Sequence, residues 1–135
     1  MIVLSNSNAQ VLPAGQSAIF DTVVLHTGCA ECYYPNSGSV TLTRSNAIYD
    51  FDFNANIGAT EAGDAQLAIT LNGSPLSETT SIVVTATAGD LQNVKAGTSR
   101  KTCCCGNPGF IMLTNTGTTD INIGTNPMLR IRRVA

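Results

Sequence analysis

Apolar and polar residues alternate along several short segments of this chain, which is typical of strands in a half-buried sheet. The clearest example is residues 47–57, AIYDFDFNANI, where the aromatic side chains share one face and the other face carries Asp50, Asp52 and Asn54. Further strands are predicted at 17–25, 39–43, 66–71, 80–87, 91–95, 110–115, 120–123 and 128–134. Gly- and Asn-containing turns separate them, and no segment of useful length has the helical period. The pattern predicts an all-β fold, a jelly-roll β-sandwich of about ten short antiparallel strands.

Several of these strands are apolar on both faces and carry few charges. In residues 67–86, LAITLNGSPLSETTSIVVTA, the polar positions are nearly all Thr, Ser or Asn. Charged residues make up 12% of the 135-residue chain, which is about half the share usual in soluble domains. Because monomers stay soluble through surface charge, we expect partner subunits to cover part of the sheet surface. A Thr-rich extracellular β protein is the alternative explanation of the same composition.

Charge and composition also argue against several classes of partner. The formal net charge is −2, Trp is absent and aromatic residues make up 5% of the chain. The chain therefore offers neither a basic field for nucleic acid nor a stacking platform. No apolar run approaches the roughly 20 residues that span a bilayer, and the first residues lack the features of a signal peptide. We expect no nucleic acid and no membrane as partners, and synthesis in a host cytoplasm.

Four runs of sequence together resemble a known family. They are GQSAIFDTVVLHTG, SVTLTRSNAIYDFDFNANI, LAITLNGSPLSETTSIVV, and the closing LTNTGTTDINI with LRIRRVA. From about Ala9 to the end, the chain is similar to small bacterial and phage domains of the complement-globular-head and tumour-necrosis-factor type, found in Firmicute phages and in a Bacillus collagen-like exosporium glycoprotein. The resemblance implies a ten-strand jelly roll in a three-fold homotrimer with an apolar axis. Upstream Gly-X-Y repeats are absent here, and the two acids of the central strand depart from the family pattern.

The start of the chain is expected to lie apart from this domain. We predict a short N-terminal arm at residues 1–8 and the jelly-roll domain at residues 9–135, self-contained and without a stalk. The apolar start of the arm would pair with the sheet edge of a partner, or would form an ordinary first edge strand or a frayed end. The residues concerned are Met1, Ile2, Val3 and Leu4.

Because the sequence has no catalytic motif and the expected trimer has no stalk, we predict a non-enzymatic structural role. The interpretation we favour is a phage capsid decoration or head-fibre protein at the virion surface, bound to the major capsid protein. The alternative is a receptor- or glycan-binding module of a phage fibre or spore surface, with Tyr33 and Tyr34 as ligand contacts.

The cysteines form the sharpest local pattern. Cys29 and Cys32 make a CxxC, and a triplet runs from Cys103 through Cys104 to Cys105. In an extended segment the outer two cysteines of the triplet point to the same side, so with the CxxC they could supply four thiolates to a structural Zn²⁺. Disulfides within or between chains are a second reading, and free thiols are a third. A thioredoxin-like site is not expected, because its CxxC needs a βαβ context.

Three further features are candidate sites. His26, the single histidine, is a metal ligand, a catalytic base or simply a loop histidine. Asp50 and Asp52 lie about 6–7 Å apart on one face of a strand, which suits a glycosidase pair, a Ca²⁺ site or a polar row. Arg130 and Arg132 share a face of the last strand, where they would contact an acidic capsid surface or a carboxylate of another chain, or protect a sheet edge.

Overall fold

The computed structural model describes residues 1–103 and 107–135 and is all-β, as the sequence pattern predicts. Its elements are β1 (Ile2–Ser5), β2 (Gln10–Leu12), β3 (Thr22–His26), β4 (Glu31–Tyr33), β5 (Val40–Leu42), β6 (Ile48–Ala59), β7 (Gly63–Leu71), β8 (Ser74–Pro75), the 3₁₀ turn η1 (Ser77–Thr79), β9 (Ser81–Thr85), β10 (Gln92–Lys101), β11 (Phe110–Thr114), β12 (Ile121–Ile123) and β13 (Met128–Arg133). Within the described ranges, no helix has the length and apolar character needed to cross a bilayer.

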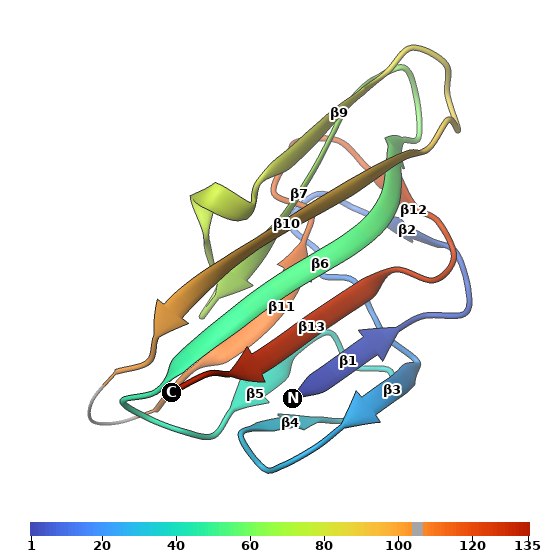
Figure 1. Ribbon diagram of the computed structural model, residues 1–135. Helices are drawn as coiled ribbons and strands as arrows, with labels where there is room; N and C mark the ends of the chain where they lie inside the picture. The colour runs from blue at the N-terminus through green and yellow to red at the C-terminus, as the bar shows by residue number, and fades with distance from the viewer. Residues whose placement is uncertain (104–106) are drawn as a thin grey trace.

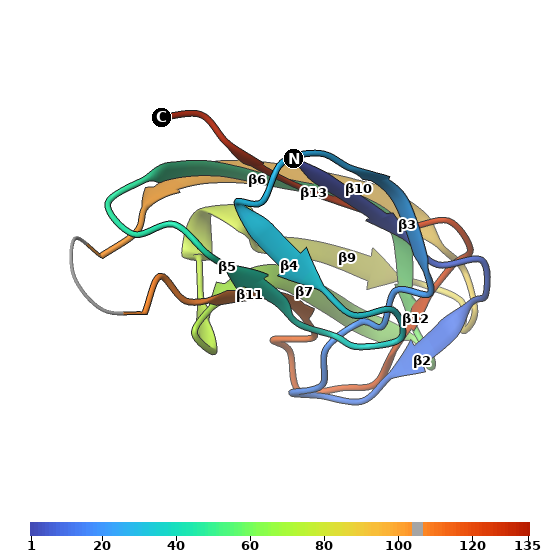
Figure 2. The ribbon, with the colours of Figure 1, turned by 90° about the horizontal axis from the view of Figure 1, so that it is seen from below.

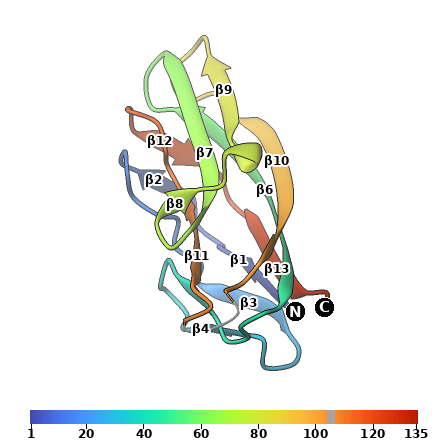
Figure 3. The ribbon, with the colours of Figure 1, turned by 90° about the vertical axis from the view of Figure 1, so that its left-hand side faces the viewer.

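The strands form two antiparallel sheets that face one another as a sandwich (Figure 2). The first sheet has the order β2-β12-β6-β13-β1-β3, and β10 pairs with the other side of β6. Figure 1 shows this sheet with β6 running through its middle. The second sheet has the order β4-β5-β11-β7-β8, and β9 also pairs with β7. Seen from the side, β7, β8 and β11 form one layer, and β6, β10 and β13 form the other (Figure 3).

The core lies between the two inner faces. The alternation predicted for the central strand is confirmed, because Tyr49, Phe51 and Phe53 are buried while Asp50 and Asp52 of β6 remain partly exposed. The rings of Tyr49 and Phe51 stack with centroids 6.2 Å apart, a favourable aromatic geometry. The other large side chains that are fully buried come from both sheets and, for Phe20, from the segment before β3: Ile2, Leu4, Phe20, Leu42, Ile57, Leu67, Ile69, Ile111 and Leu113.

The strand predicted at 17–25 is shorter than expected. Only β3 is regular strand, and Ser17 contributes an isolated bridge to Thr114. Between them, Phe20 turns into the core. The Gln10 side chain forms hydrogen bonds with both backbone groups of Ile19. Its Nε2 donates to the Ile19 carbonyl at 3.1 Å, and its Oε1 accepts from the Ile19 N–H at 3.0 Å. A side-chain amide has therefore replaced a strand neighbour at this point.

The strand predicted at 91–95 is longer than expected. Ala96-Gly97 is typical of a turn in the sequence, yet β10 continues through it to Lys101 and pairs with residues 48–57 of β6. A Cβ on Gly97 would lie 2.9 Å from both Asp52 Cβ and the Phe51 carbonyl oxygen. The glycine thus permits close approach of two strands rather than a turn. The sequence pattern did not predict β2, β4 and β8, and a strand at β1 was one of its alternatives for residues 1–4. These four strands raise the number in the described residues above ten.

The predicted N-terminal arm is corrected by the structure. β1 lies inside the first sheet, paired with β13 on one side and β3 on the other. The side chains of Ile2 and Leu4 have no exposed area. Residues 2–5 are therefore part of the sandwich and are not free to add to the sheet edge of a partner.

Candidate interaction surfaces

The outer face of the first sheet carries a ladder of charged pairs between β13 and β6. Arg130 stands opposite Asp52 and donates through Nε to Oδ1 at 2.9 Å and through Nη2 to Oδ2 at 2.6 Å. In the next pair, Arg132 Nη2 lies 3.2 Å from Asp50 Oδ2. Ser99 of β10 donates a short hydrogen bond to the same carboxylate. Register alone aligns these side chains, because alternate residues of each strand face the same side.

The ladder changes the chemistry expected of the two acids. The hydrogen bond from Ser99, followed by that from Arg132, lowers the pKa of Asp50 below its ordinary value. A carboxylate held ionised in this way is a poor general acid. Each acid also has a guanidinium partner, which supplies the positive charge that a Ca²⁺ ion would bring. The arrangement favours the polar row over a glycosidase pair or a calcium site, and the carboxylates that meet the two arginines belong to the same chain rather than to another.

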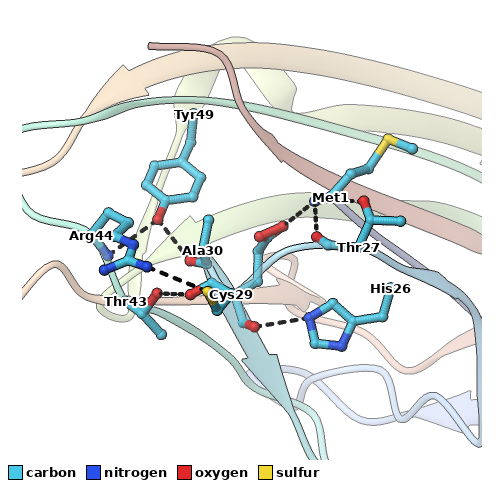
Figure 4. A network of polar contacts seen from close by, with 9 residues as sticks. Met1, His26, Thr27, Cys29, Ala30, Thr43, Arg44 and Tyr49 are labelled. Carbon is cyan, nitrogen blue, oxygen red and sulfur yellow. Dashed lines mark hydrogen bonds and ion pairs between the residues drawn. The ribbon is translucent and has the colours of Figure 1, made fainter.

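Cys29 lies in the loop between β3 and β4, beside Thr43 and Arg44 of the β5–β6 loop (Figure 4). Cys32 lies on β4, opposite Thr41 of β5. Arg44 Nη2 lies 3.4 Å from Cys29 Sγ. The cysteines that the structure describes are free thiols: Cys29, Cys32 and Cys103. Across residues 1–103 and 107–135, no three His, Cys, Asp or Glu side chains gather as a metal site. Cys104 and Cys105 lie outside the described residues, so a zinc site or disulfide that uses them stays a prediction.

The other predicted contact residues separate into buried and exposed groups. Tyr33 points inward, and its hydroxyl accepts from Phe20 N at 3.2 Å and donates to Phe20 O at 2.6 Å. Burial raises the pKa of this tyrosine, and its side chain is not available to a ligand. Tyr34 is 75% exposed and remains available. His26 is exposed, and its Nε2 lies 3.0 Å from the carbonyl of Glu31, a contact that suits the loop histidine better than a catalytic base.

Two edge strands present apolar side chains to solvent. All five residues of β3 are exposed, including Val23, Val24 and Leu25, and in the described part of the chain β1 is its sole strand neighbour. On β9, Ile82 and Val84 are 59% and 67% exposed, opposite a buried face that packs on the core. Apolar edges of this kind mark sites of association. In the sequence, the apolar character of both faces of residues 80–87 was the sign that this strand would be covered by a partner subunit.

The start of the chain contains an ion pair that the sequence did not indicate. Glu31 lies between the two cysteines of the CxxC, and its side chain is fully buried. Its Oε1 lies 2.7 Å from the α-ammonium nitrogen of Met1. The sequence gives no sign that Glu31 is buried and paired, because the pairing of β1 with β3 brings Met1 close to it.

Comparison with known proteins defines the fold. No family model matches the sequence, and no curated protein matches it either. The structure is similar to the crystal structure of murine APRIL at pH 5.0, with a TM-score of 0.66 and 11% identity over 97% of this chain and 96% of that one. It is also similar to rabbit GITRL, with a TM-score of 0.54 and 9% identity over 100% of this chain and 95% of that one. The chain therefore has the tumour-necrosis-factor-like jelly-roll fold.

A weaker similarity extends to the vertex protein P5 of PRD1, with a TM-score of 0.47 and 12% identity over 95% of this chain and 92% of that one.

Proposed function

We propose that this protein is a non-enzymatic structural protein that forms a homotrimer on the surface of a phage virion, as a capsid decoration or head-fibre protein. The observation that carries the proposal is the pair of apolar edge strands, β3 and β9, on a sandwich that is otherwise poor in surface charge. Water-exposed apolar edges are a liability in a monomer. Association of three copies removes that liability.

The described side chains support a role without catalysis. Asp50 and Asp52 are paired with arginines, and His26 contacts a backbone carbonyl. None of the described cysteines forms a hydrogen bond with His26. A nucleophile held by a base, or two carboxylates in different protonation states, is the usual sign of a hydrolytic site. The chemistry of the described surface is that of binding.

Attachment to a capsid requires a second surface, and basic residues that form no ion pair within the described part of the chain suggest one. Arg130 and Arg132, for which the sequence left a capsid contact open as one of three roles, are already paired with acids of their own chain. Lys101 and Arg133 flank the start of β6, where they pair in register with Ile48 and Tyr49. Arg44 lies at the same end, since its backbone N–H donates to the Tyr49 hydroxyl at 3.2 Å.

Three of the acids that form no ion pair within the described residues lie at the opposite end of β6. Asp120 accepts a hydrogen bond from Thr60 N through its carbonyl at 3.4 Å, Asp90 packs on Gly58, and Glu61 lies in the turn after β6. None of these three acids forms an ion pair within the described part of the chain. We therefore propose that the basic end, with Arg44, meets an acidic surface of the major capsid protein.

Native mass spectrometry and capsid binding test the proposal, and two further observations separate it from the receptor-binding alternative. Native mass spectrometry, with and without reductant and chelator, should give a trimer, and a monomer at all concentrations would overturn the assembly. Purified protein should then co-sediment with capsids that lack it, and an Arg44→Ala variant should bind more weakly and with less salt dependence. Retention on glycan arrays that is lost in Tyr34→Ala, without capsid binding, would favour the receptor-binding alternative. A gene position between capsid and tail genes would separate the same two roles.

A further inference from the structure

The turn between β7 and β8, which lie in one layer with β11 (Figure 3), is fastened to the start of β11 by an asparagine side chain. Leu71 pairs with Ser74, so Asn72 and Gly73 are the two central residues of this hairpin. Their φ angles are +54° and +83°, as a tight Asn-Gly hairpin turn requires. Asn72 N donates to the Phe110 carbonyl at 2.9 Å, and Asn72 Oδ1 accepts from Phe110 N at 3.1 Å. The side-chain amide thus extends the pairing of β7 with β11 by one residue.

The residue beneath this amide is a glycine. A Cβ on Gly109 would lie 2.8 Å from Asn72 Oδ1 and 3.0 Å from Asn72 Nδ2, and the φ of Gly109 is +111°. Gly109 is buried and held on both sides, since Leu42 N donates to its carbonyl at 2.9 Å and Asn107 Oδ1 accepts from its N–H at 3.0 Å. A side chain at position 109 would therefore displace the Asn72 amide from Phe110.

The same turn has the chemistry of a modification site. Asn72 and Gly73 are exposed, and nothing lies within 4 Å of the place where Gly73 would carry a Cβ. The backbone nitrogen of a residue without a side chain is the least hindered nucleophile that can attack the amide carbon of the asparagine before it. Asn36 is also exposed and has a φ of +65°, but the residue after it is Ser37, whose Cβ hinders the same attack.

We propose that Asn72 is a site of spontaneous deamidation and that its hydrogen bond with Phe110 N restrains the reaction. The Gly73 nitrogen forms a bond to Asn72 Cγ, the bond from Cγ to Nδ2 breaks, and the proton of Gly73 N leaves with the ammonia. Water then opens the cyclic imide at either carbonyl, which gives aspartate or isoaspartate and one new negative charge. The reaction needs no oxidant or reductant. The proposal concerns the monomer and is independent of the proposed virion role.

The two products differ in their effect on the fold. Aspartate keeps an oxygen in the position of Oδ1, so the contact with Phe110 N is retained. Isoaspartate adds a methylene to the main chain, and the carbonyl that accepted from Phe110 N becomes part of the backbone. The added length shifts Ser74 and Pro75 out of register with β7. Isoaspartate is thus the product that releases β8 from the second sheet.

The test compares the folded protein with the same chain unfolded in guanidinium chloride, at one temperature and pH. Peptide mapping by mass spectrometry follows the gain of about 1 Da at Asn72, with Asn36 as an internal control. Because the folded chain reacts only when the turn opens, we expect conversion of Asn72 to be at least about tenfold slower than in the unfolded chain. Equal rates would overturn the restraint. An unfolded chain in which Asn72 converts no faster than Asn36 would overturn the site.

A variant tests the role of the hydrogen bond without denaturant. In Gly109→Ala the new Cβ pushes the Asn72 amide away from Phe110 N, so Asn72 should convert about tenfold faster than in the folded wild type. Gly89→Ala is a matched control, because Gly89 has a φ of +86° but nothing within 4 Å of its Cβ position, and it should leave the rate unchanged. A folded Gly109→Ala that converts at the wild-type rate would overturn the role of the bond. If this variant does not fold, the comparison on the wild-type chain decides.

Discussion

The apolar face of β9 offers the most direct test of assembly. Replacing Ile82 and Val84 together by Ser removes two side chains that are 59% and 67% exposed in the single chain. Because both already face water, the isolated protomer should lose little stability, within about 0.5 kcal/mol for each site, apart from the lower β-propensity of Ser. In a trimer that covers β9, the same changes remove buried contacts from every protomer.

The magnitude follows from those exposed fractions. Complete burial of a Val or Ile side chain is worth about 1.5–3 kcal/mol, so covering the exposed part contributes about 1–2 kcal/mol at each site. The sum is about 2–4 kcal/mol for each protomer and about 6–12 kcal/mol for the trimer. The concentration at half dissociation varies with the square root of the dissociation constant. Since 1.4 kcal/mol is about a tenfold change, we expect it to rise about a hundredfold or more.

Sedimentation equilibrium over a concentration series measures this shift, and circular dichroism verifies that the variant is folded. Val11→Ser is a matched control, because Val11 lies on edge strand β2 with the same 59% exposure as Ile82 but outside the proposed interface. It should leave the half-dissociation concentration unchanged. A double variant that dissociates at the wild-type concentration would refute the placement of β9 in the interface.

Three other outcomes are expected. Ser99→Ala should move the pKa of Asp50 back toward its ordinary value, and NMR titration can follow this change. Because that pKa is lowered in the folded state, Asp50 contributes to stability above its unfolded-state pKa. This contribution is lost as the pH falls through the folded-state pKa. Phe53→Ala should lower the free energy of unfolding by about 3–5 kcal/mol, measured in urea, because the ring is buried at the centre of β6. A thiol reagent should modify exposed Cys29 before half-buried Cys32, as peptide mapping can show.

The fold class was predictable because it depends on local alternation. The aromatic face of β6 could be read from residues 47–57 alone, since side chains of a strand alternate between its faces. The same rule put Arg130 and Arg132 on one face of the last strand. It could not identify their partners, because Asp52, the partner of Arg130, lies 78 positions earlier in the chain. Sequence spacing predicts a face, whereas cross-strand register decides which faces meet.

Errors in the prediction occurred where one residue type has two structural uses. Gly97 signals a turn in the sequence, but in the structure it relieves the contact of β10 with Asp52. Gln10 reads as an ordinary polar residue, yet its amide substitutes for a strand neighbour of Ile19. Short strands such as β4 were missed because three residues with Tyr and Cys show too little alternation to stand out. Each case depends on a tertiary neighbour that local patterns do not contain.

The structure shows how part of the small number of charges is arranged on the outer face of the first sheet. Four charges on the outer face of the first sheet cancel in two pairs, Arg130 with Asp52 and Arg132 with Asp50. Lys95 and Lys101 of β10 lie on the same face, opposite Asn54 and Ile48, and form no ion pair within the described residues. Paired charges can be covered by a partner at a lower cost than isolated ones, because each retains its counter-ion when water leaves. The apolar edges β3 and β9 and this neutral ladder are therefore compatible with one assembly. Composition alone predicted a covered surface, and the cross-strand pairs explain how the four charges of the ladder can take part in it.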